Sequence, residues 1–313
     1  MLGTAEYVPL SRRRFLIGVA GVAVLGLAPR RVLAAPAPYS FKHGDFEVIV
    51  VSDGYIGGPS SFHATDVPAT EREAFFKEMG LDLQEVRGEV NLTLIHAGDD
   101  LILFDTGGTG FQPTMGTIND SLMAAGVAPS DVTKVVFSHG HPDHIWGTIL
   151  PDGQLRFPNA AYYSGAVEWD FWNSPEIFNI LPGEMHGMAT ESQRHYAAVK
   201  DIVTMVKPGD DIVTGISALD TPGHTPGHLS FEVAGGDGLI IATDTIIHPV
   251  IYFAHPEWRF GFDSIHEQAV ASRKSLLDRA ATDKVKLLGY HWTYPGVGYA
   301  ERKGQGYVFV PSN

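Results

Sequence analysis

The chain has 313 residues, 44% of them hydrophobic, which suits one large globular domain or two small ones. Its formal net charge is −14, so we expect no nucleic-acid partner and no attraction to an anionic membrane, because both carry negative charge. It contains no cysteine, which excludes disulfides, thiolate nucleophiles and thiolate metal ligands.

The first residues have the features of an export signal. An arginine cluster at Arg12–Arg14 precedes the apolar run Phe15–Ala28, and small residues follow. The run is shorter than the roughly 20 residues of a membrane span, so we favour a signal peptide and keep an N-terminal anchor as the alternative. Ser11–Leu16 resembles the twin-arginine signal. The predicted destination is therefore the periplasm or the cell exterior.

We expect cleavage after Ala34, so that residues 1–34 are the signal and residues 35–313 form a single domain with no stable membrane insertion. Cleavage removes five arginines and one glutamate from the 22 Lys+Arg and 36 Asp+Glu of the whole chain. The mature chain then carries a net charge of −18. This stronger acidity gives further weight to the expectation of a small-molecule partner rather than nucleic acid.

Short apolar strands alternate with helical stretches in the first half of the mature chain. The hydrophobic pattern predicts, in chain order, a strand at Phe46–Gly54, a hairpin at Asn91–Gly108 that turns at Gly98, a helix at Pro113–Ala125 ended by Gly126, and a buried strand at Asp131–Ser138. The stretch 169–208 has mixed aromatic, His and Met content and few strand signals, so we predict an insertion or a lid there.

The second half repeats this organisation. It predicts strands at Gly215–Gly223, His228–Gly236 and Gly238–Thr245, an amphipathic helix at Asp263–Ala281 and a strand at Val285–His291. No linker rich in Pro, Gly or Ser divides the halves. The fold class is therefore α/β, with two sheets and helices outside them.

Good metal ligands follow the ends of four predicted strands. They are His139, His141, Asp143 and His144 after the first-half strand, and His224, Asp244 and His291 in the second half. Loops at strand ends are where a rigid sheet can fix convergent ligands. Alone, His291 is more often a structural histidine and Asp244 a simple cap. The cluster at 139–144 is different, because burying three imidazoles and a carboxylate without a metal would be costly.

Seven ligands are too many for one tetrahedral ion but divide well between two. We assign His139, His141 and His224 to the first ion, Asp143, His144 and His291 to the second, and Asp244 to a bridge between them. Imidazoles with few carboxylates favour zinc, with manganese, cobalt or iron as alternatives. Open positions would hold a shared water, whose pKa metal binding lowers from 15.7 toward about 7. Asp244 and Asp143 are thus also our candidate catalytic residues.

The motifs resemble those of the metallo-β-lactamase superfamily. The stretch "HGHPDH" at 139–144 is similar to its His-x-His-x-Asp-His motif, and "DTPGHTPGH", "ATD" and "GYH" are similar to the later ones. The resemblance implies an αββα sandwich with a dinuclear site at one edge. It also implies that Asp105, in "LFDTGG", orients the site without binding metal. The absence of cysteine and the presence of Asp244 make an antibiotic-degrading β-lactamase a weaker candidate.

Within that superfamily the chain is most similar to the methyl parathion hydrolase branch. The spacings of 85 residues from His139 to His224, 20 to Asp244 and 47 to His291 carry this likeness, as does the C-terminal tail. Acyl-homoserine lactonases are a second resemblance. By analogy Phe111 and Trp172 line an apolar substrate pocket, although simple core packing explains both equally well.

The remaining histidines have weaker signals. We expect His228 and His248 to support ligands by hydrogen bonds, because they lie near ligands in the sequence. For His43, His63, His96, His186, His195, His255 and His266 we expect surface or structural roles.

The sequence therefore predicts an exported dinuclear hydrolase that uses a bridging hydroxide on a lactone or an organophosphate triester. Its alternatives are a β-lactamase or thioester hydrolase of the same fold, a redox relative, or a non-catalytic metal-binding protein. Redox relatives have a glutamate at the position of His141 and an added flavin domain, which this chain lacks. A homodimer is left open.

Overall fold

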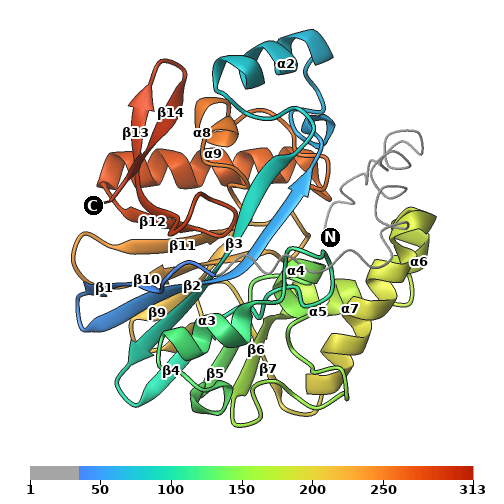
Figure 1. Cartoon of the computed structure of the whole chain (residues 1–313), viewed down its shortest axis with the longest axis vertical. Coiled ribbons are helices and arrows are strands. Elements are labelled where there is room, and N and C mark those ends of the chain that lie inside the picture. The colour runs from blue at the N-terminus through green and yellow to red at the C-terminus, as the bar shows by residue number, and fades with distance from the viewer. Residues whose placement is uncertain (1–34, 313) are drawn as a thin grey trace.

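Two seven-stranded sheets lie face to face at the centre of the fold (Figure 1). The computed structural model describes residues 35–312, and the predicted signal at 1–34 lies outside the described residues. The first sheet consists of β1 (Tyr39–His43), β2 (Phe46–Gly58), β3 (Val86–Ala97), β4 (Asp100–Phe104), β5 (Lys134–Phe137), β6 (Ala161–Gly165) and β7 (Val203–Val206). The second consists of β8 (Asp211–Val213), β9 (Ile216–Asp220), β10 (Leu229–Val233), β11 (Leu239–Thr243), β12 (Lys286–Gly289), β13 (Val297–Lys303) and β14 (Gly306–Pro311).

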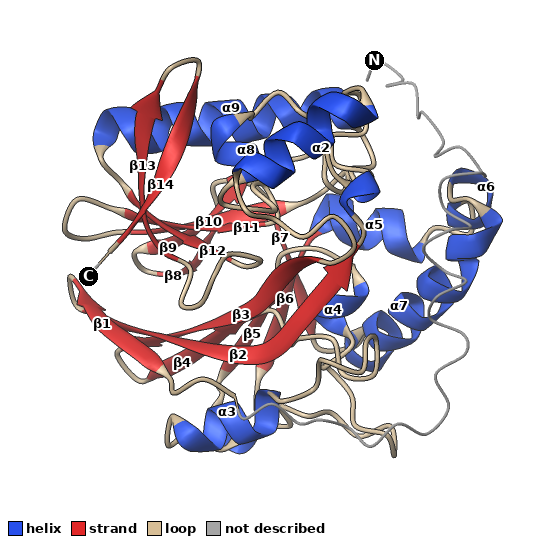
Figure 2. Cartoon of the chain, turned by 45° about the horizontal axis from the view of Figure 1, so that its top comes forward, coloured by secondary structure: helices blue, strands red, loops and turns tan. Residues whose placement is uncertain are grey.

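Helices cover the outer face of each sheet, as Figure 2 shows for α3 on one side and α9 on the other. They are α2 (Ala69–Glu78), α3 (Ile118–Ala124), α4 (Pro142–Ile145), α5 (Ala166–Asn173), α6 (Ile177–Ile180), α7 (His186–Val199), α8 (Ile251–Ala254) and α9 (His266–Asp283). Short 3₁₀ turns occur at Ser60–Phe62, Pro129–Asp131 and Gly183–Met185. The predicted αββα sandwich is confirmed.

The strand directions bring the ends of distant strands to one edge. In the first sheet β4, β5, β6 and β7 run parallel to one another. In the second sheet β11 and β12 are parallel, and β10 is antiparallel to both β9 and β11, so β9, β11 and β12 share a direction. The segments that follow β5, β9, β11 and β12 therefore start at corresponding edges of the two sheets, which is the geometric basis of the site described below.

Three apolar clusters hold these layers together. The cluster between the sheets joins β-strand residues of both, and Phe104 of β4 meets Phe231 of β10 there with ring centroids 4.8 Å apart. A second cluster packs α3, α5 and α7 against the first sheet, and a third packs α8 and α9 against the second. Each sheet is thus buried on both faces, as the continuous apolar runs in its strands predict.

One predicted helix begins later than expected. The pattern predicts a start at Pro113, but α3 begins at Ile118. The preceding residues lie alongside β2, because Tyr55 donates its N–H to the carbonyl of Thr114. The buried Asp53 carboxylate then accepts the N–H of Ile118 at 2.8 Å, which satisfies a donor in the first turn of the helix.

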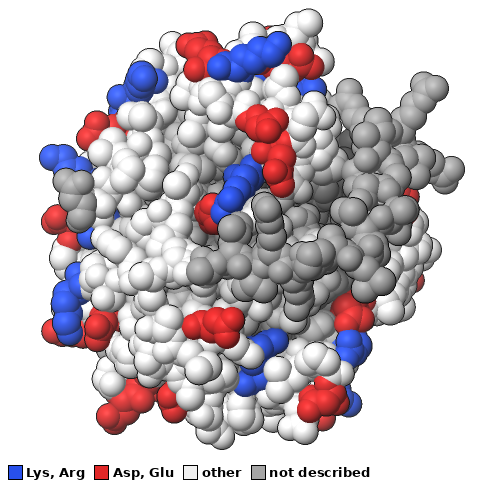
Figure 3. All heavy atoms as spheres, in the orientation of Figure 1, with Lys and Arg blue, Asp and Glu red and all other residues white. Residues whose placement is uncertain are grey.

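The predicted lid at 169–208 is a helical layer. Helices α5, α6 and α7 place side chains such as Trp172, Tyr196 and Val199 in the core on the outer face of the first sheet. Within 35–312 no helix combines the length and the apolar character needed to cross a bilayer. On the face seen in Figure 3, acidic and basic side chains of the described residues lie interspersed, with no large patch of either sign.

The contact between the sheets gives the first prediction. Phe231→Ala removes a fully buried ring from the cluster between the sheets, and we expect the free energy of unfolding to fall by about 3–5 kcal/mol. Chemical denaturation of the metal-loaded protein measures this loss. Met123→Ala, at a side chain that is 70% exposed, is the control and is expected to change stability by less than about 0.5 kcal/mol. Equal effects of the two substitutions would contradict the assigned packing.

Candidate metal centre

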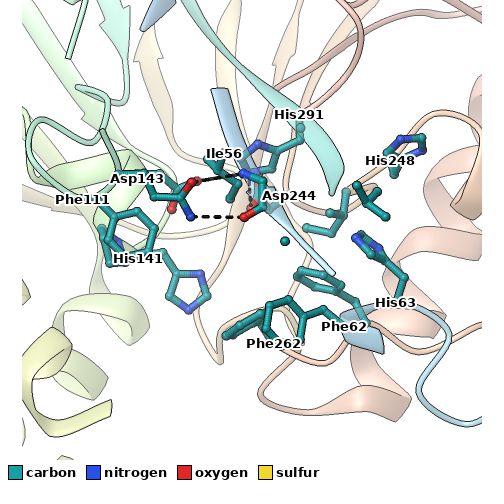
Figure 4. A pocket seen from close by; sticks show the side chains of 18 of the residues that line it. Ile56, Phe62, His63, Phe111, His141, Asp143, Asp244, His248, Phe262 and His291 are labelled. Atoms are coloured by element: carbon teal, nitrogen blue, oxygen red, sulfur yellow. Dashed lines mark hydrogen bonds and ion pairs between the residues drawn. The ribbon is translucent and has the colours of Figure 1, made fainter. Parts of the chain in front are cut away.

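The structure brings all seven predicted ligand side chains together at one edge of the sandwich. Figure 4 shows His141, Asp143, Asp244 and His291 among them. They come from the segment after β5 and from α4 (His139, His141, Asp143, His144), and from the segments after β9 (His224), β11 (Asp244) and β12 (His291). All seven are buried. Pro142 is the first residue of α4, where its fixed backbone angle suits a helix start, and this single turn presents Asp143 and His144 to the centre.

His139, His141 and His224 face a common point. Nε2 of His139 lies 3.0 Å from Nδ1 of His141, which lies 2.9 Å from Nε2 of His224. Three nitrogens bound to one tetrahedral ion at about 2.0–2.1 Å would lie about 3.3 Å apart. The observed separations are a few tenths of an ångström shorter, so the three side chains are close to the geometry of one metal site.

Asp143, His144 and His291 form a second group beside the first. Oδ2 of Asp143 lies 3.2 Å from Nε2 of His291 and 3.4 Å from Nε2 of His144. Figure 4 shows Asp143 and His291 pointing toward each other and toward Asp244. This group supplies two imidazoles and one carboxylate, a donor set that zinc and neighbouring first-row ions accept.

Asp244 lies between the two groups. Its Oδ2 is 3.3 Å from Nε2 of His224 in the first group, and 3.2 Å and 3.4 Å from Nε2 of His291 and His144 in the second. One carboxylate oxygen thus faces nitrogens of both groups, which is the position that a bridging ligand needs.

Asp105 and Ser138 orient two of the histidines from behind. Nδ1 of His144 donates to Oδ2 of Asp105 at 2.8 Å. The Ser138 hydroxyl donates to the same carboxylate oxygen at 2.7 Å and accepts from Nδ1 of His139 at 3.0 Å. Because a neutral imidazole has a single N–H, the Nε2 of both rings carries a lone pair directed at the centre. Asp105 therefore lies where the resemblance placed it.

Two other histidines are fixed in the same way. Nδ1 of His291 donates to the backbone carbonyl of Glu89 at 2.8 Å. Nδ1 of His224 donates to Oδ1 of Asp263 at 3.0 Å, and Asp263 in turn pairs with the fully buried Arg273 at 3.1 Å. The sequence analysis did not identify Asp263 or Arg273, because both lie in the stretch predicted to be an amphipathic helix and neither belongs to a motif.

Lone pairs and negative charges converge at the centre, and positive charge between them is needed to offset their mutual repulsion. Nε2 of His144 and Oδ1 of Asp244 are buried without a hydrogen-bond partner among the described residues. Burial lowers the pKa of His291, but Asp244 and Asp143 outweigh it and raise the pKa to about 10. Burial is likewise outweighed at His224, where Asp244 and Asp263 raise the pKa to about 9. This donor set fits two divalent cations, which would take the place of those protons.

Unusual backbone angles occur next to the ligands. Thr243 has φ +44° and Asp105 has φ +60°, a region that a β-branched residue such as Thr rarely adopts. The turn at Thr243 directs Asp244 into the centre. His228 supports this turn, because its Nε2 accepts the N–H of Asp244 at 3.2 Å.

A cavity with largely apolar walls opens onto the donors. Its apolar side chains are Ile56, Phe62, Val86, Phe111, Pro142, Met188, Ile247, Phe260 and Phe262. Phe111 therefore lies in the pocket wall as predicted. Of the stretch 169–208 only Met188 is among the lining residues, whereas the end of β2 and the turn after it contribute a wall that no sequence signal indicated.

Trp172 and His248 do not lie where the sequence analysis placed them. Trp172 is buried in the core behind His141, with ring centroids 5.7 Å apart, and is not part of the cavity wall. It restricts the ligand loop instead, because a Cβ at Gly140 would lie 2.4 Å from its Nε1. His248 lines the cavity, and its Nδ1 accepts the N–H of Val250 rather than bonding to a ligand.

Glu168 of α5 joins the two histidine loops and was missed by sequence reasoning. Its Oε1 accepts the N–H of Gly140 at 2.9 Å and Nε1–H of Trp172 at 2.5 Å. Its Oε2 accepts the hydroxyl of Thr225 at 2.7 Å and the N–H of Gly227 at 3.0 Å. One buried carboxylate therefore connects the loop of His139 and His141 to the loop of His224.

Comparison with known proteins places this geometry in a family. The profile described as Metallo-beta-lactamase superfamily matches residues 86–291. Metallo-beta-lactamase domain-containing protein 1 of Xenopus laevis is 30% identical over 57% of this chain and 59% of its own length. N-acyl homoserine lactonase AttM of Agrobacterium fabrum is 34% identical over 36% of this chain and 40% of its own. This chain thus spans 40–59% of the length of these two relatives.

A solved structure extends the likeness to nearly the whole fold. AidC, described as a dizinc quorum-quenching lactonase in complex with the product N-hexanoyl-L-homoserine, superposes with a TM-score of 0.83 at 28% sequence identity. The match covers 88% of this chain and 98% of AidC.

The four hydrogen bonds of Glu168 give a testable prediction. In Glu168→Gln the amide nitrogen cannot accept, so two buried donors lose their partner, at about 1–3 kcal/mol each. We expect denaturation to show a loss of about 2–5 kcal/mol in the free energy of unfolding. We also expect faster loss of metal during dialysis against a chelator, because the two histidine loops are no longer tied.

Glu78→Gln, on the exposed surface of α2, is the matched control and is expected to keep both values unchanged. Wild-type stability and metal retention in Glu168→Gln would show that Glu168 does not hold these loops.

Proposed function

The chain belongs to the metallo-beta-lactamase superfamily and is a metal-dependent hydrolase; from this premise we propose that it is an exported dinuclear enzyme that opens the ring of a lactone. The observation that carries the proposal is the convergence of seven buried donors, five of which (His141, Asp143, His224, Asp244 and His291) line an apolar cavity. The relatives AidC and AttM, described as lactonases, support the substrate class.

The reaction is the addition of one water across an ester bond. The water oxygen bonds to the carbonyl carbon, the ring C–O bond breaks, the ring oxygen takes up a proton, and the product is an open hydroxy acid. When bound, the two cations supply a water of lowered pKa and polarise the carbonyl oxygen. We propose zinc for both, because histidines dominate the donor set.

Asp143 is the residue of this chain that handles the proton. It lines the cavity, its Oδ2 faces His291, and its Oδ1 makes no hydrogen bond among the described residues. Oδ1 takes the proton from the attacking water and delivers it to the leaving ring oxygen. Asp244 keeps the two donor groups at a fixed separation, with its Oδ2 between them.

An organophosphate triester is the second candidate substrate. The ligand spacing similar to the methyl parathion hydrolase branch motivates it, and so does the aromatic wall. Phe62, Phe111, Phe260 and Phe262 all line the cavity and would pack against an aryl leaving group. The lactone is favoured because AidC, described as a lactonase, matches over most of the fold.

Substrate comparison tests the proposal. The metal-loaded protein is assayed on N-hexanoyl-homoserine lactone, an aryl ester and an aryl phosphotriester, and we expect kcat/KM on the lactone to exceed the others by at least about tenfold. Asp143→Asn is expected to lower it by about 10²-fold or more. Chelation should abolish turnover, and zinc, manganese or cobalt should restore it. Turnover by metal-free protein would rule out the proposed chemistry, and a preference for the phosphotriester would select the second candidate.

Export by the twin-arginine route is a separate proposal, supported by the arginine cluster and the apolar run after it. The change Arg12→Lys with Arg13→Lys is expected to keep the protein in the cytoplasm, because that pathway recognises the arginine pair. Fractionation of cells that express each form measures this. Equal amounts of both forms outside the cytoplasm would contradict the proposal.

A further inference from the structure

One long turn forms the part of the cavity wall next to Asp143. Residues 108–116, here called the wall turn, lie between β4 and α3 and place Phe111 in the wall. Figure 4 shows Phe111 and Asp143 on the same side of Asp244. A Cβ at Gly108 would lie 2.7 Å from Cα of Asp143, so the start of the wall turn packs directly against the backbone of this residue.

A single carboxylate joins the two ends of the wall turn. Asp53 is fully buried in β2, and its Oδ2 accepts the N–H of Gly108 at 2.9 Å. Its Oδ1 accepts the N–H of Gly116 at 3.1 Å and that of Ile118 at 2.8 Å. The first sheet therefore fixes both ends of the wall turn through one side chain, and the residues between them follow its position.

These three hydrogen bonds suit an ionised Asp53. Burial raises the pKa of Asp53 to about 6, although the N–H groups of Gly108 and Ile118 and the charge of Arg156 oppose this rise. Near neutral pH the side chain is therefore a carboxylate, and both of its oxygens can accept. Arg156 also donates to Oγ1 of Thr109 at 3.1 Å, so the cation that stabilises this carboxylate holds the wall turn as well.

The position of Phe111 depends on the wall turn. Its N–H is donated to the carbonyl of Gly108 at 2.9 Å, and its partly buried ring meets Trp146 edge-on with centroids 5.6 Å apart. Asp143 has a separate support, because the hydroxyl of Tyr290 donates to its backbone carbonyl at 2.7 Å. A displaced wall turn would therefore move Phe111 more than it moves Asp143.

We propose that Asp53 is a positioning residue for substrate binding: by closing the wall turn it holds the ring of Phe111 against the apolar part of a bound molecule. An apolar contact away from the reacting bond stabilises the bound substrate and the transition state alike. Its loss therefore raises KM and leaves kcat nearly unchanged. This inference rests on the proposed lactone hydrolysis for its kinetic test and on the cavity alone for its binding test.

The kinetic test compares γ-decalactone, which carries an alkyl arm, with γ-butyrolactone, which carries none. In Asp53→Asn the amide nitrogen cannot accept, so at least one N–H of the wall turn or of Ile118 loses its acceptor. We expect KM for γ-decalactone to rise about tenfold and kcat to change by less than about twofold. Metal content should equal that of wild type, because the ligands keep their own supports, such as Asp105 and Asp263.

Asp131→Asn is the matched control. The carboxylate of Asp131 also accepts a backbone N–H in a turn, that of Ala128 at 2.8 Å, but this turn is exposed and does not line the cavity. Thr109→Val is a second variant, which loosens the wall turn at its bond to Arg156 and should raise the same KM by a smaller factor. Wild-type KM values in whichever of Asp53→Asn and Thr109→Val folds would overturn the proposal.

A double-mutant cycle shows whether Asp53 acts through Phe111. Phe111→Ala alone should lower the ratio of kcat/KM for γ-decalactone to that for γ-butyrolactone by about tenfold. Added to Phe111→Ala, Asp53→Asn should lower this ratio by less than about a further twofold, because the ring that it positions is gone. Independent, multiplying effects of the two substitutions would show that Asp53 only stabilises the fold, and would overturn the positioning role.

Calorimetric binding separates this inference from the proposed function. Metal-loaded protein is titrated with octanoate and with acetate, which need no turnover and share a carboxylate. We expect wild type to bind octanoate at least about tenfold more tightly, and Asp53→Asn to lose most of this preference. Absence of lactone hydrolysis with this pattern intact would overturn only the function. No preference in wild type, or the full preference in Asp53→Asn, would overturn the role of Asp53.

Discussion

The structure depends on one electrostatic constraint: lone pairs of buried imidazoles and carboxylates point at one another across about 3 Å, and they are compatible only with a cation between them. His144, His224 and His291 each donate their outer N–H to an oxygen, so their inner nitrogens cannot also carry a proton without taking on charge. Asp244 faces these nitrogens with a single oxygen. The donor cluster therefore has the chemistry that a metal centre requires.

The fold resists the mutual repulsion of these groups by holding each ligand from behind. Asp105 lies at the end of β4, Asp263 is held by Arg273 of α9, and Glu168 of α5 ties the loops after β5 and β9 to each other. These three carboxylates come from three different layers of the sandwich. A shift of any one of these layers would move a carboxylate and, with it, the ligand that this carboxylate holds. The packing of the helices therefore affects the positions of the ligands.

Two kinds of surface line the cavity, one apolar and one polar. Phenylalanines such as Phe111 and Phe262 supply apolar area, which binds without direction. His63 and His248 supply polar ring nitrogens to the wall, where a hydrogen bond would require a correctly placed partner.

The sequence by itself determined the sandwich and indicated the seven side chains that the structure brings together, because strand periodicity and the "HGHPDH" motif are local patterns. It placed Phe111 in the pocket wall and Asp105 beside the ligands. It could not assign Glu168, Asp263 or His63, and it placed Trp172 and His248 incorrectly. Their roles arise from contacts between residues up to 189 positions apart, such as His63 with Tyr252. Tertiary packing decides such contacts, because the direction of a side chain relative to distant elements produces no periodic pattern in the sequence.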